Sequence, residues 1–326
     1  MPMRRSALAS RLAVIAGVCS AMASCSGGPP PEKEGFLTTG DGVRLYYRVV
    51  GNGAETIIAP LASIHATHLD PLARGRRLVL YDPRGRGRSG RVEPARVSLE
   101  HQLSDLEAVR AEVGADKVSL IGWSGLGMEL FVYTLRHPDR VDRLVQLAPV
   151  PPRREPYAEQ MMQDRDKRSD RELSAEIKRR LEAGEYKDRQ AELCRDIARA
   201  TNGSMFADPA RAAEAPDLCQ YEAEWPEYLW PYFDALLGSF GDFDWRARLA
   251  EVKTPRLVIH GAQDNIPLEG NREWVAGQVN ARLLVVDNSG HWLLYEQPTL
   301  VLSAIDAFLS GVWPAGSEAI PAARQG

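Results

Sequence analysis

The sequence predicts an α/β protein in which a mostly parallel sheet is covered by helices on both faces. Short runs rich in β-branched and aliphatic residues alternate with stretches of helical periodicity, as in sheets whose parallel strands are joined by helices. Two strand-like runs at the start are joined by Asp41-Gly42, a dipeptide typical of an antiparallel hairpin. Residues 151–245 break the alternation, since they contain no strand-like run. We therefore expect an eight-stranded sheet with a helical lid inserted after the sixth strand.

The elements are expected in the following order along the chain. The hairpin comes first, and the alternation of strands and helices then runs up to the lid and resumes at residue 256. The predicted strands span residues 36–39, 43–50, 56–59, 77–81, 117–121, 143–147, 256–260 and 282–286, and the predicted helices outside the lid span 99–113, 128–135, 269–279 and 298–309. The core thus comprises residues 36–150 and 246–312, and residues 313–326 are expected to form a loose tail.

Residues 1–24 have the composition of a secretory signal peptide. Three arginines form a basic start, and the apolar run over residues 12–23 is too short to span a bilayer. Residues 22–25 resemble a lipobox, where bacterial signal peptidase cuts before a lipid-modified cysteine, here Cys25. Residues 25–35 are expected to form a flexible tether. The sequence therefore predicts a protein that is exported and lipid-anchored at the bacterial cell envelope, or else released into the periplasm. The alternative is an apolar N-terminus of a cytoplasmic protein.

Charge and cysteine content narrow the partners and the compartment. Removal of residues 1–24 takes away three arginines and no acids, so 40 basic and 44 acidic residues become 37 and 44, a net charge of −7. This charge disfavours nucleic acid as a partner, and a membrane would be reached only through a lipid on Cys25. Cys194 and Cys219 are expected either to pair in an oxidising compartment or to remain two buried thiols.

A serine in a sharp turn between a predicted strand and a predicted helix is the candidate nucleophile. The strand over residues 117–121 runs into Gly122-Trp123-Ser124-Gly125, and an apolar helical stretch follows. Such a turn lifts the hydroxyl clear of the sheet edge, and it needs small neighbours because strand and helix approach closely. Leu126 stands where the Gly-x-Ser-x-Gly pattern has its second glycine. The alternative interpretation of Ser124 is a helix N-cap.

Two further polar residues follow later strands and complete a candidate catalytic triad. Asp264 comes after the strand at 256–260, and His291 comes after the strand at 282–286. Because the carboxyl ends of parallel strands meet at one edge of a sheet, we expect both to lie beside Ser124. His291 would take the proton of the serine hydroxyl, and Asp264 would hold the imidazole. A serine nucleophile indicates acyl transfer from esters, amides or peptides to water.

The motifs in the order Ser, Asp, His resemble those of the α/β-hydrolase superfamily over nearly the whole core. Residues 82–89 are similar to that family's Asp-x-Arg-Gly-x-Gly-x-Ser loop after the fourth strand, which implies a structural role for the arginines rather than a polyanion site. The family commonly carries His-Gly-Gly after the third strand, where this chain has Ala59-Pro60-Leu61-Ala62. Pro60 has no N–H, so the oxyanion hole is expected to use the amides of Leu61 and Gly125.

The lid sequence leads to the prediction of substrate. Residues 217–230 hold four acids, four aromatics and no basic residue, and the lidded pattern most resembles the proline iminopeptidase-like branch of the family. In that branch acidic lid residues recognise the free amino end of a peptide, so the resemblance implies an aminopeptidase. The expected substrate is a small molecule or short peptide, and the substrate-binding candidates are Trp123, Glu222, Glu224 and Glu227.

Two other functions stay open at this stage. If the lid acids form only a solvated face, the enzyme would be a carboxylesterase or lipase-like hydrolase of small esters. If Leu126 and Pro60 disable the site, the chain would be a non-catalytic lipoprotein that uses the fold as a binding platform. No cofactor or metal is expected, because the triad supplies both nucleophile and base, and His65 and His68 have no third ligand nearby in the sequence. The sequence does not define an oligomeric state.

Overall fold

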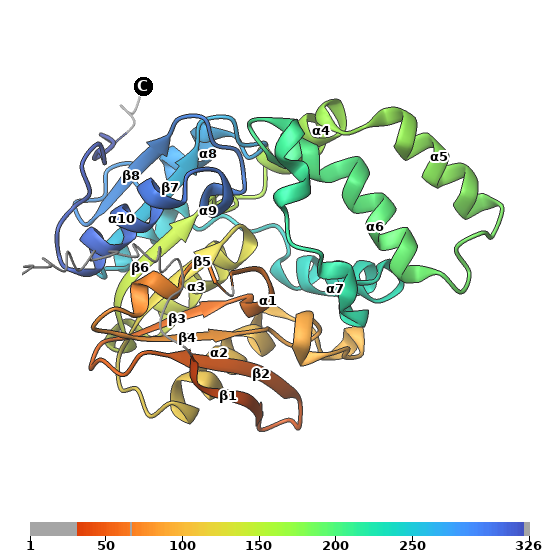
Figure 1. Ribbon diagram of the computed structural model, residues 1–326. Coiled ribbons are helices and arrows are strands. Elements are labelled where there is room, and N and C mark those ends of the chain that lie inside the picture. Colours follow the sequence, from red (N-terminus) through yellow and green to blue (C-terminus); the bar gives the residue numbers. More distant parts are fainter. Residues whose placement is uncertain (1–30, 66, 323–326) are drawn as a thin grey trace, which may run out of the picture.

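Eight strands form one sheet in the computed structural model of the chain, which describes residues 31–65 and 67–322 (Figure 1). The strand order is β1-β2-β4-β3-β5-β6-β7-β8; β2 pairs antiparallel with β1 and β4, and all other neighbours are parallel. The strands are β1 (Pro31–Thr38), β2 (Arg44–Val50), β3 (Thr56–Pro60), β4 (Arg77–Tyr81), β5 (Val118–Trp123), β6 (Val141–Leu147), β7 (Arg256–Gly261) and β8 (Ala281–Val286). The prediction of an eight-stranded, mostly parallel sheet is confirmed. The predicted signal peptide and Cys25 lie outside the described residues.

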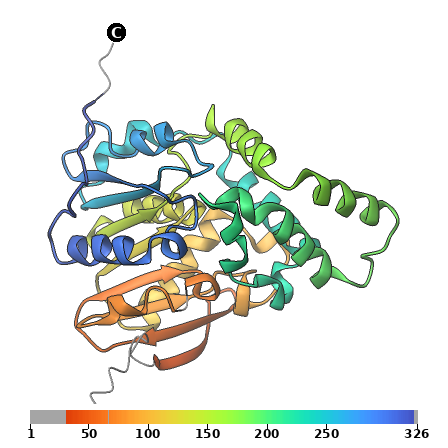
Figure 2. The ribbon, with the colours of Figure 1, turned by 45° about the horizontal axis from the view of Figure 1, so that its top comes forward.

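Helices cover both faces of the sheet, and each face has its own apolar core (Figure 2). α2 and α3 pack on one face, and α9 and α10 pack on the other. The helices are α1 (Ala62–His65), α2 (Leu99–Glu112), α3 (Gly125–Arg136), α4 (Tyr157–Arg168), α5 (Arg171–Glu182), α6 (Gln190–Thr201), α7 (Pro226–Phe240), α8 (Leu268–Glu273), α9 (Leu293–Glu296) and α10 (Pro298–Leu309). In the part of the chain that the structure describes, no helix is both long and apolar enough to cross a membrane.

Local sequence signals set where these elements begin. Ser98 caps α2, since its hydroxyl accepts a hydrogen bond of 3.3 Å from the amide of His101. Asp170 caps α5 in the same way and accepts 3.0 Å from the amide of Leu173. Gly42 takes a φ of 84° in the turn between β1 and β2, a conformation that glycine adopts without a steric penalty. The apolar stretches between these signals then form the elements that bury the core.

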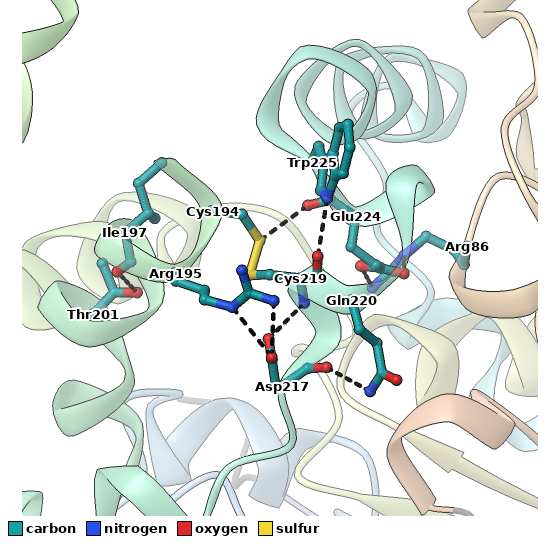
Figure 3. The surroundings of a disulfide bond; sticks show 10 residues. All are labelled: Arg86, Cys194, Arg195, Ile197, Thr201, Asp217, Cys219, Gln220, Glu224 and Trp225. Carbon is teal, nitrogen blue, oxygen red and sulfur yellow. Dashed lines mark hydrogen bonds and ion pairs between the residues drawn. A yellow bond between two sulfur atoms is a disulfide. The ribbon is translucent and has the colours of Figure 1, made fainter. Parts of the chain in front are cut away.

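The lid lies between β6 and β7, as the sequence predicts, and consists of α4 to α7 with short 3₁₀ helices between them. α5 and α6 enclose a small core of their own around Ile177, Tyr186 and Leu193, and Figure 1 shows this pair extending away from the sheet. A disulfide joins Cys194 of α6 to Cys219 (Figure 3). The paired form of the two lid cysteines is thus confirmed over two free thiols.

Two predicted boundaries are corrected. Residues 31–35, assigned to the tether, belong to β1 and pair with β2. Residues 313–322, assigned to the loose tail, pack on the core: Glu318 forms a bridge with Leu283 of β8, and Trp313 packs against the apolar core beneath α10. Residues 31–35 show no apolar alternation, and backbone hydrogen bonds to β2, which leave no pattern in the sequence, decide their place. Residues 313–322 show neither a strand nor a helix pattern, and they are held by the bridge of Glu318 and by the packing of Trp313 and Ile320 on the core.

Candidate active site

Ser124 lies in the turn between β5 and α3 with a strained backbone. Its φ of 58° and ψ of −128° fall in a region that residues with side chains seldom adopt. A Cβ at Gly122 would lie 2.8 Å from the carbonyl oxygen of Leu126, and one at Gly127 would lie 2.9 Å from the Cβ of Pro149. The close approach of β5 and α3 therefore needs glycine at positions 122 and 127, and it tolerates the leucine at position 126. Ser124 occupies the N-cap position of α3, but its hydroxyl makes no capping hydrogen bond and lies within reach of His291 instead.

The three predicted triad residues meet at the carboxyl ends of β5, β7 and β8. His291 Nε2 lies 3.0 Å from Ser124 Oγ, and His291 Nδ1 lies 3.1 Å from both carboxylate oxygens of Asp264. Burial of Asp264 by itself would raise its pKa, but the charge and the hydrogen bond of His291 outweigh this, and the pKa lies below its ordinary value. Asp264 is thus an ionised carboxylate that orients the imidazole, and the imidazole reaches the hydroxyl.

The loop that carries the histidine is held from both the core and the lid. The indole N–H of Trp123 donates a hydrogen bond of 2.9 Å to the carbonyl of His291, and the two rings pack at a tilt of 42° with their centroids 4.7 Å apart. The amide of His291 donates 2.7 Å to the carbonyl of Met205 in the lid. The amide of Gly290 donates 2.6 Å to Glu296, which also accepts from a lid amide. Trp123, predicted to bind substrate, lines the cavity and also positions His291.

Leu61 and Gly125, the predicted oxyanion-hole residues, both line the cavity that contains Ser124. Leu61 follows the last residue of β3 and has a φ of 67°, an uncommon conformation for leucine. Gly125 is the first residue of α3, so its N–H has no acceptor within the helix. The structure brings both residues to the nucleophile, and the role of their amides stays a prediction.

A cavity of about 390 Å³ opens on Ser124 between the core and the lid. Most of its wall is apolar. The segment after β3, the helix α3 and the lid contribute the apolar side chains, which include Leu61, Ile64, Leu126, Met205, Phe233 and Leu237. Besides the triad histidine, its charged lining residues are Arg86, Glu129 and Arg165. The sequence analysis missed Glu129. The signal that could have found it is its place as the single charged residue in the apolar stretch 126–135, directly after the nucleophile.

None of the three acidic lid residues predicted to bind substrate lines this cavity. Glu224 is buried and accepts two hydrogen bonds of 2.9 Å from Arg86 and one of 2.8 Å from the amide of Gly87 (Figure 3 shows the pair with Arg86). Glu222 is exposed and lies 3.5 Å from a surface arginine, and Glu227 lines a separate open cleft of about 810 Å³. This corrects the prediction: ion pairing with the loop after β4 turns the acidic segment away from Ser124.

The loop after β4 uses its arginines as structural ties, as the family resemblance implies. Arg84 is buried and pairs with Asp105 at 2.6 Å and with Asp41 at 2.9 Å. The buried carboxylate of Asp82 accepts 2.9 Å from the amide of Arg88. The loop thereby fixes the position of Arg86, which sits at the edge of the cavity.

Around His65 and His68, considered as a metal site, the described residues offer no third ligand. Burial lowers the pKa of His65 to about 3, so this imidazole is neutral at physiological pH. The ring of His68 packs on Tyr295 at 4.1 Å between centroids. Across residues 31–65 and 67–322, no three His, Cys, Asp or Glu side chains lie close enough together to hold a metal ion.

The chain belongs to the α/β-hydrolase fold family, because residues 63–298, most of its length, match the model of that family. Family membership, together with relatives that are hydrolases and esterases, makes it a hydrolase. The predicted family and enzyme class are confirmed.

Named relatives have several activities. A bifunctional esterase/perhydrolase of Acinetobacter calcoaceticus is 26% identical over 77% of this chain and 88% of its own. A 2-hydroxy-6-oxononadienedioate/2-hydroxy-6-oxononatrienedioate hydrolase of Cupriavidus pinatubonensis is 27% identical over 80% and 90%. A proline iminopeptidase of Saccharolobus solfataricus is 24% identical over 83% and 91%. The solved structure of an esterase from Exiguobacterium antarcticum superposes with a TM-score of 0.64 at 18% identity and covers 85% of this chain and all of its own, which shows a shared fold.

Proposed function

We propose that this chain hydrolyses carboxylic esters through an acyl intermediate on Ser124. The observation that carries the proposal is the mainly apolar cavity of about 390 Å³ that opens on an assembled triad. An acyl chain bound there would leave water, and each buried CH₂ group would contribute about 0.8 kcal/mol to binding. The similarity to an esterase/perhydrolase supports the proposal.

The reaction would proceed in two halves. Ser124 Oγ attacks the ester carbonyl carbon while His291 Nε2 takes the hydroxyl proton, and the amides of Leu61 and Gly125 hold the negative charge that forms on the carbonyl oxygen. The C–O bond then breaks, and the alcohol leaves with the proton from His291. In the second half His291 takes a proton from water, whose oxygen attacks the acyl carbon, and the carboxylic acid leaves as Ser124 regains its proton. Asp264 remains ionised throughout and stabilises the imidazolium.

An aminopeptidase of the proline iminopeptidase type is the second candidate. The similarity to a proline iminopeptidase favours it, and the same triad can cleave amides. It comes second because Glu222, Glu224 and Glu227, the residues predicted to hold the amino end, do not line the cavity.

The test is a substrate panel on the purified protein. We expect turnover of p-nitrophenyl acetate, butyrate and hexanoate, with kcat/KM rising with acyl length, and a loss of kcat of about 10⁴-fold or more in Ser124→Ala. The exposed lid serine in Ser174→Ala serves as the matched control and should leave turnover unchanged. Faster cleavage of alanyl- and prolyl-naphthylamides than of any ester, abolished when the amine is acetylated, would replace the esterase by the aminopeptidase.

We also propose that the protein is exported. The disulfide between Cys194 and Cys219 supports this, because disulfides persist in oxidising compartments and are rare in the cytosol. In a bacterial host the full chain should fractionate with the envelope, and Cys25→Ala should move it to the soluble periplasmic fraction. Full-length protein that stays in the cytosol with both lid thiols free would contradict export.

A further inference from the structure

We propose that Glu129 forms a subsite for a cationic amino group carried by the substrate. The inference rests on the proposed hydrolysis at Ser124 and adds a substrate class to it: small esters with a protonated amine or a quaternary ammonium group. Three observations carry it, namely the burial of Glu129, its lack of a hydrogen-bond partner among the described residues, and the pairing of Arg86 with another carboxylate, Glu224.

Glu129 is a buried acid that lines the cavity containing Ser124. Its exposed fraction is 4%, and it lies on α3 among the fully buried residues Leu130, Phe131 and Val132. Burial of a carboxylate without a partner is costly, and an apolar residue at this position would pack against the core at no such cost. A glutamate here is therefore not explained by packing.

The other buried acids of the described chain all accept hydrogen bonds, and Glu129 accepts none from a protein group. The seven that do are Asp70, Asp82, Asp105, Asp196, Glu224, Glu296 and the triad residue Asp264, whose side chain is fully buried. A structural role for Glu129 would be expected to show the same kind of donors. Its carboxyl group instead keeps its acceptor capacity for a group that enters the cavity.

The arginine whose charge acts on Glu129 is already paired with another carboxylate. The charge of Arg86 acts on Glu129, but two of the Arg86 N–H groups already donate to the carboxylate of Glu224, at 2.9 Å each. The Arg86–Glu224 pair is therefore close to neutral as a unit. The other charged residues of the lining are Arg165, which is exposed on α4, and His291 of the triad. Burial raises the pKa of Glu129 to about 8, and a cation in the cavity would favour the ionised form.

Two aromatic rings of the lid also line the cavity. Tyr232 and Phe233 of α7 lie there, and the guanidinium carbon of Arg86 lies 5.7 Å and 5.3 Å from their ring centroids. The rings thus already face the Arg86 cation, and the carboxyl group of Glu129 is the part of this lining that can supply opposite charge to a cation of the substrate. A cavity with this carboxyl group matches an alkylammonium group better than a neutral alkyl group of the same shape.

The position of Glu129 also sets how far the cation sits from the reacting carbonyl. Glu129 lies five positions after Ser124, which corresponds to a rise of about 7.5 Å along the helix axis. Helical side chains lean toward the N-terminus of their helix, and in α3 this is the direction of the nucleophile. An amino group a few bonds from the ester carbonyl would reach it. We expect the cation on either the acyl or the alcohol side of the ester.

The experiment compares isosteric esters that differ only in charge. On the acyl side the pair is the p-nitrophenyl esters of 4-(trimethylammonio)butanoate and 5,5-dimethylhexanoate; on the alcohol side it is acetylcholine and 3,3-dimethylbutyl acetate. In the wild type we expect kcat/KM to favour the cationic member of at least one pair by about tenfold. In Glu129→Gln this ratio should fall to about one.

A pH series separates a subsite from a structural role. Because both members of a pair depend equally on His291, their ratio removes its titration, and in the wild type the ratio should rise toward pH 8 as Glu129 ionises. It should be flat in Glu129→Gln. A ratio near one in both pairs, unchanged by Glu129→Gln, would overturn the subsite while Ser124-dependent turnover of neutral esters stands. The subsite can also be tested without hydrolysis, by measuring how tightly Ser124→Ala binds the amides of the two acyl-side acids, which should favour the cationic amide. If the wild type hydrolyses no ester at all, the proposed function fails, but this binding measurement still tests the subsite.

Discussion

The substitution Glu129→Gln should change the pH dependence of stability in a way that can be calculated. Burial raises the pKa of this carboxyl from 4.5 to about 8 in the folded chain. Between these values the folded state holds a proton that the unfolded state has lost, so wild-type stability falls as pH rises, by about 1.4 kcal/mol per pH unit. Glutamine cannot lose a proton. The variant should therefore match the wild type near pH 5 and exceed it by about 4 kcal/mol at pH 8.

The assay is urea unfolding followed by tryptophan fluorescence at pH 5, 6, 7 and 8. Glu182→Gln, at the exposed end of α5, is the matched control. A difference between Glu129→Gln and the wild type that stays constant from pH 5 to 8 would refute the reasoning. It would mean that the folded protein stabilises the ionised carboxylate with a partner of its own.

Three further substitutions test the lid and the core. Glu224→Gln leaves the guanidinium of Arg86 without its carboxylate and should cost about 3–5 kcal/mol in thermal unfolding; most of the loss should return in the double variant with Arg86→Met, and no recovery would contradict the pairing. Arg256 is fully buried on β7, its guanidinium nitrogens have no hydrogen-bond partner among the described residues, and it packs 5.3 Å from the Phe131 ring, so Arg256→Met should raise the free energy of unfolding by about 1–4 kcal/mol; a lower Tm would argue against this. The disulfide spans 25 residues, so replacing both lid cysteines by serine should cost about 3 kcal/mol, and reductant should lower the Tm of the wild type alone.

The fold could be predicted from the sequence because its signals are local. Alternating strand and helix patterns gave the eight strands, and the strands bounded the lid. Where the helical pattern is weak, the predicted boundary differs from the observed one: the helix expected over residues 269–279 ends at Glu273. Residues 31–35 were misassigned because backbone pairing with β2, rather than a side-chain pattern, holds them, and residues 313–322 because they pack on the core without forming a regular element.

The triad could also be predicted, because each of its residues follows a strand and parallel strands end at one edge. That rule places Ser124, Asp264 and His291 together before any coordinates are known, and the structure gives the distances. It also shows why Leu126 is tolerated, since the close contacts of the elbow fall on the glycines to either side.

The substrate cavity was decided by the tertiary structure alone. The direction in which a lid carboxylate points depends on which distant group reaches it, and Arg86, 138 positions before Glu224 in the chain, draws that acid away from the nucleophile. Glu129 enters the cavity because α3 buries it there, whereas in the sequence it is one acid in an apolar helix. The sequence by itself determined the chemistry at Ser124. The tertiary structure decided that Glu129, and none of the three lid acids, lines the cavity with Ser124, because long-range electrostatic partners leave no local pattern.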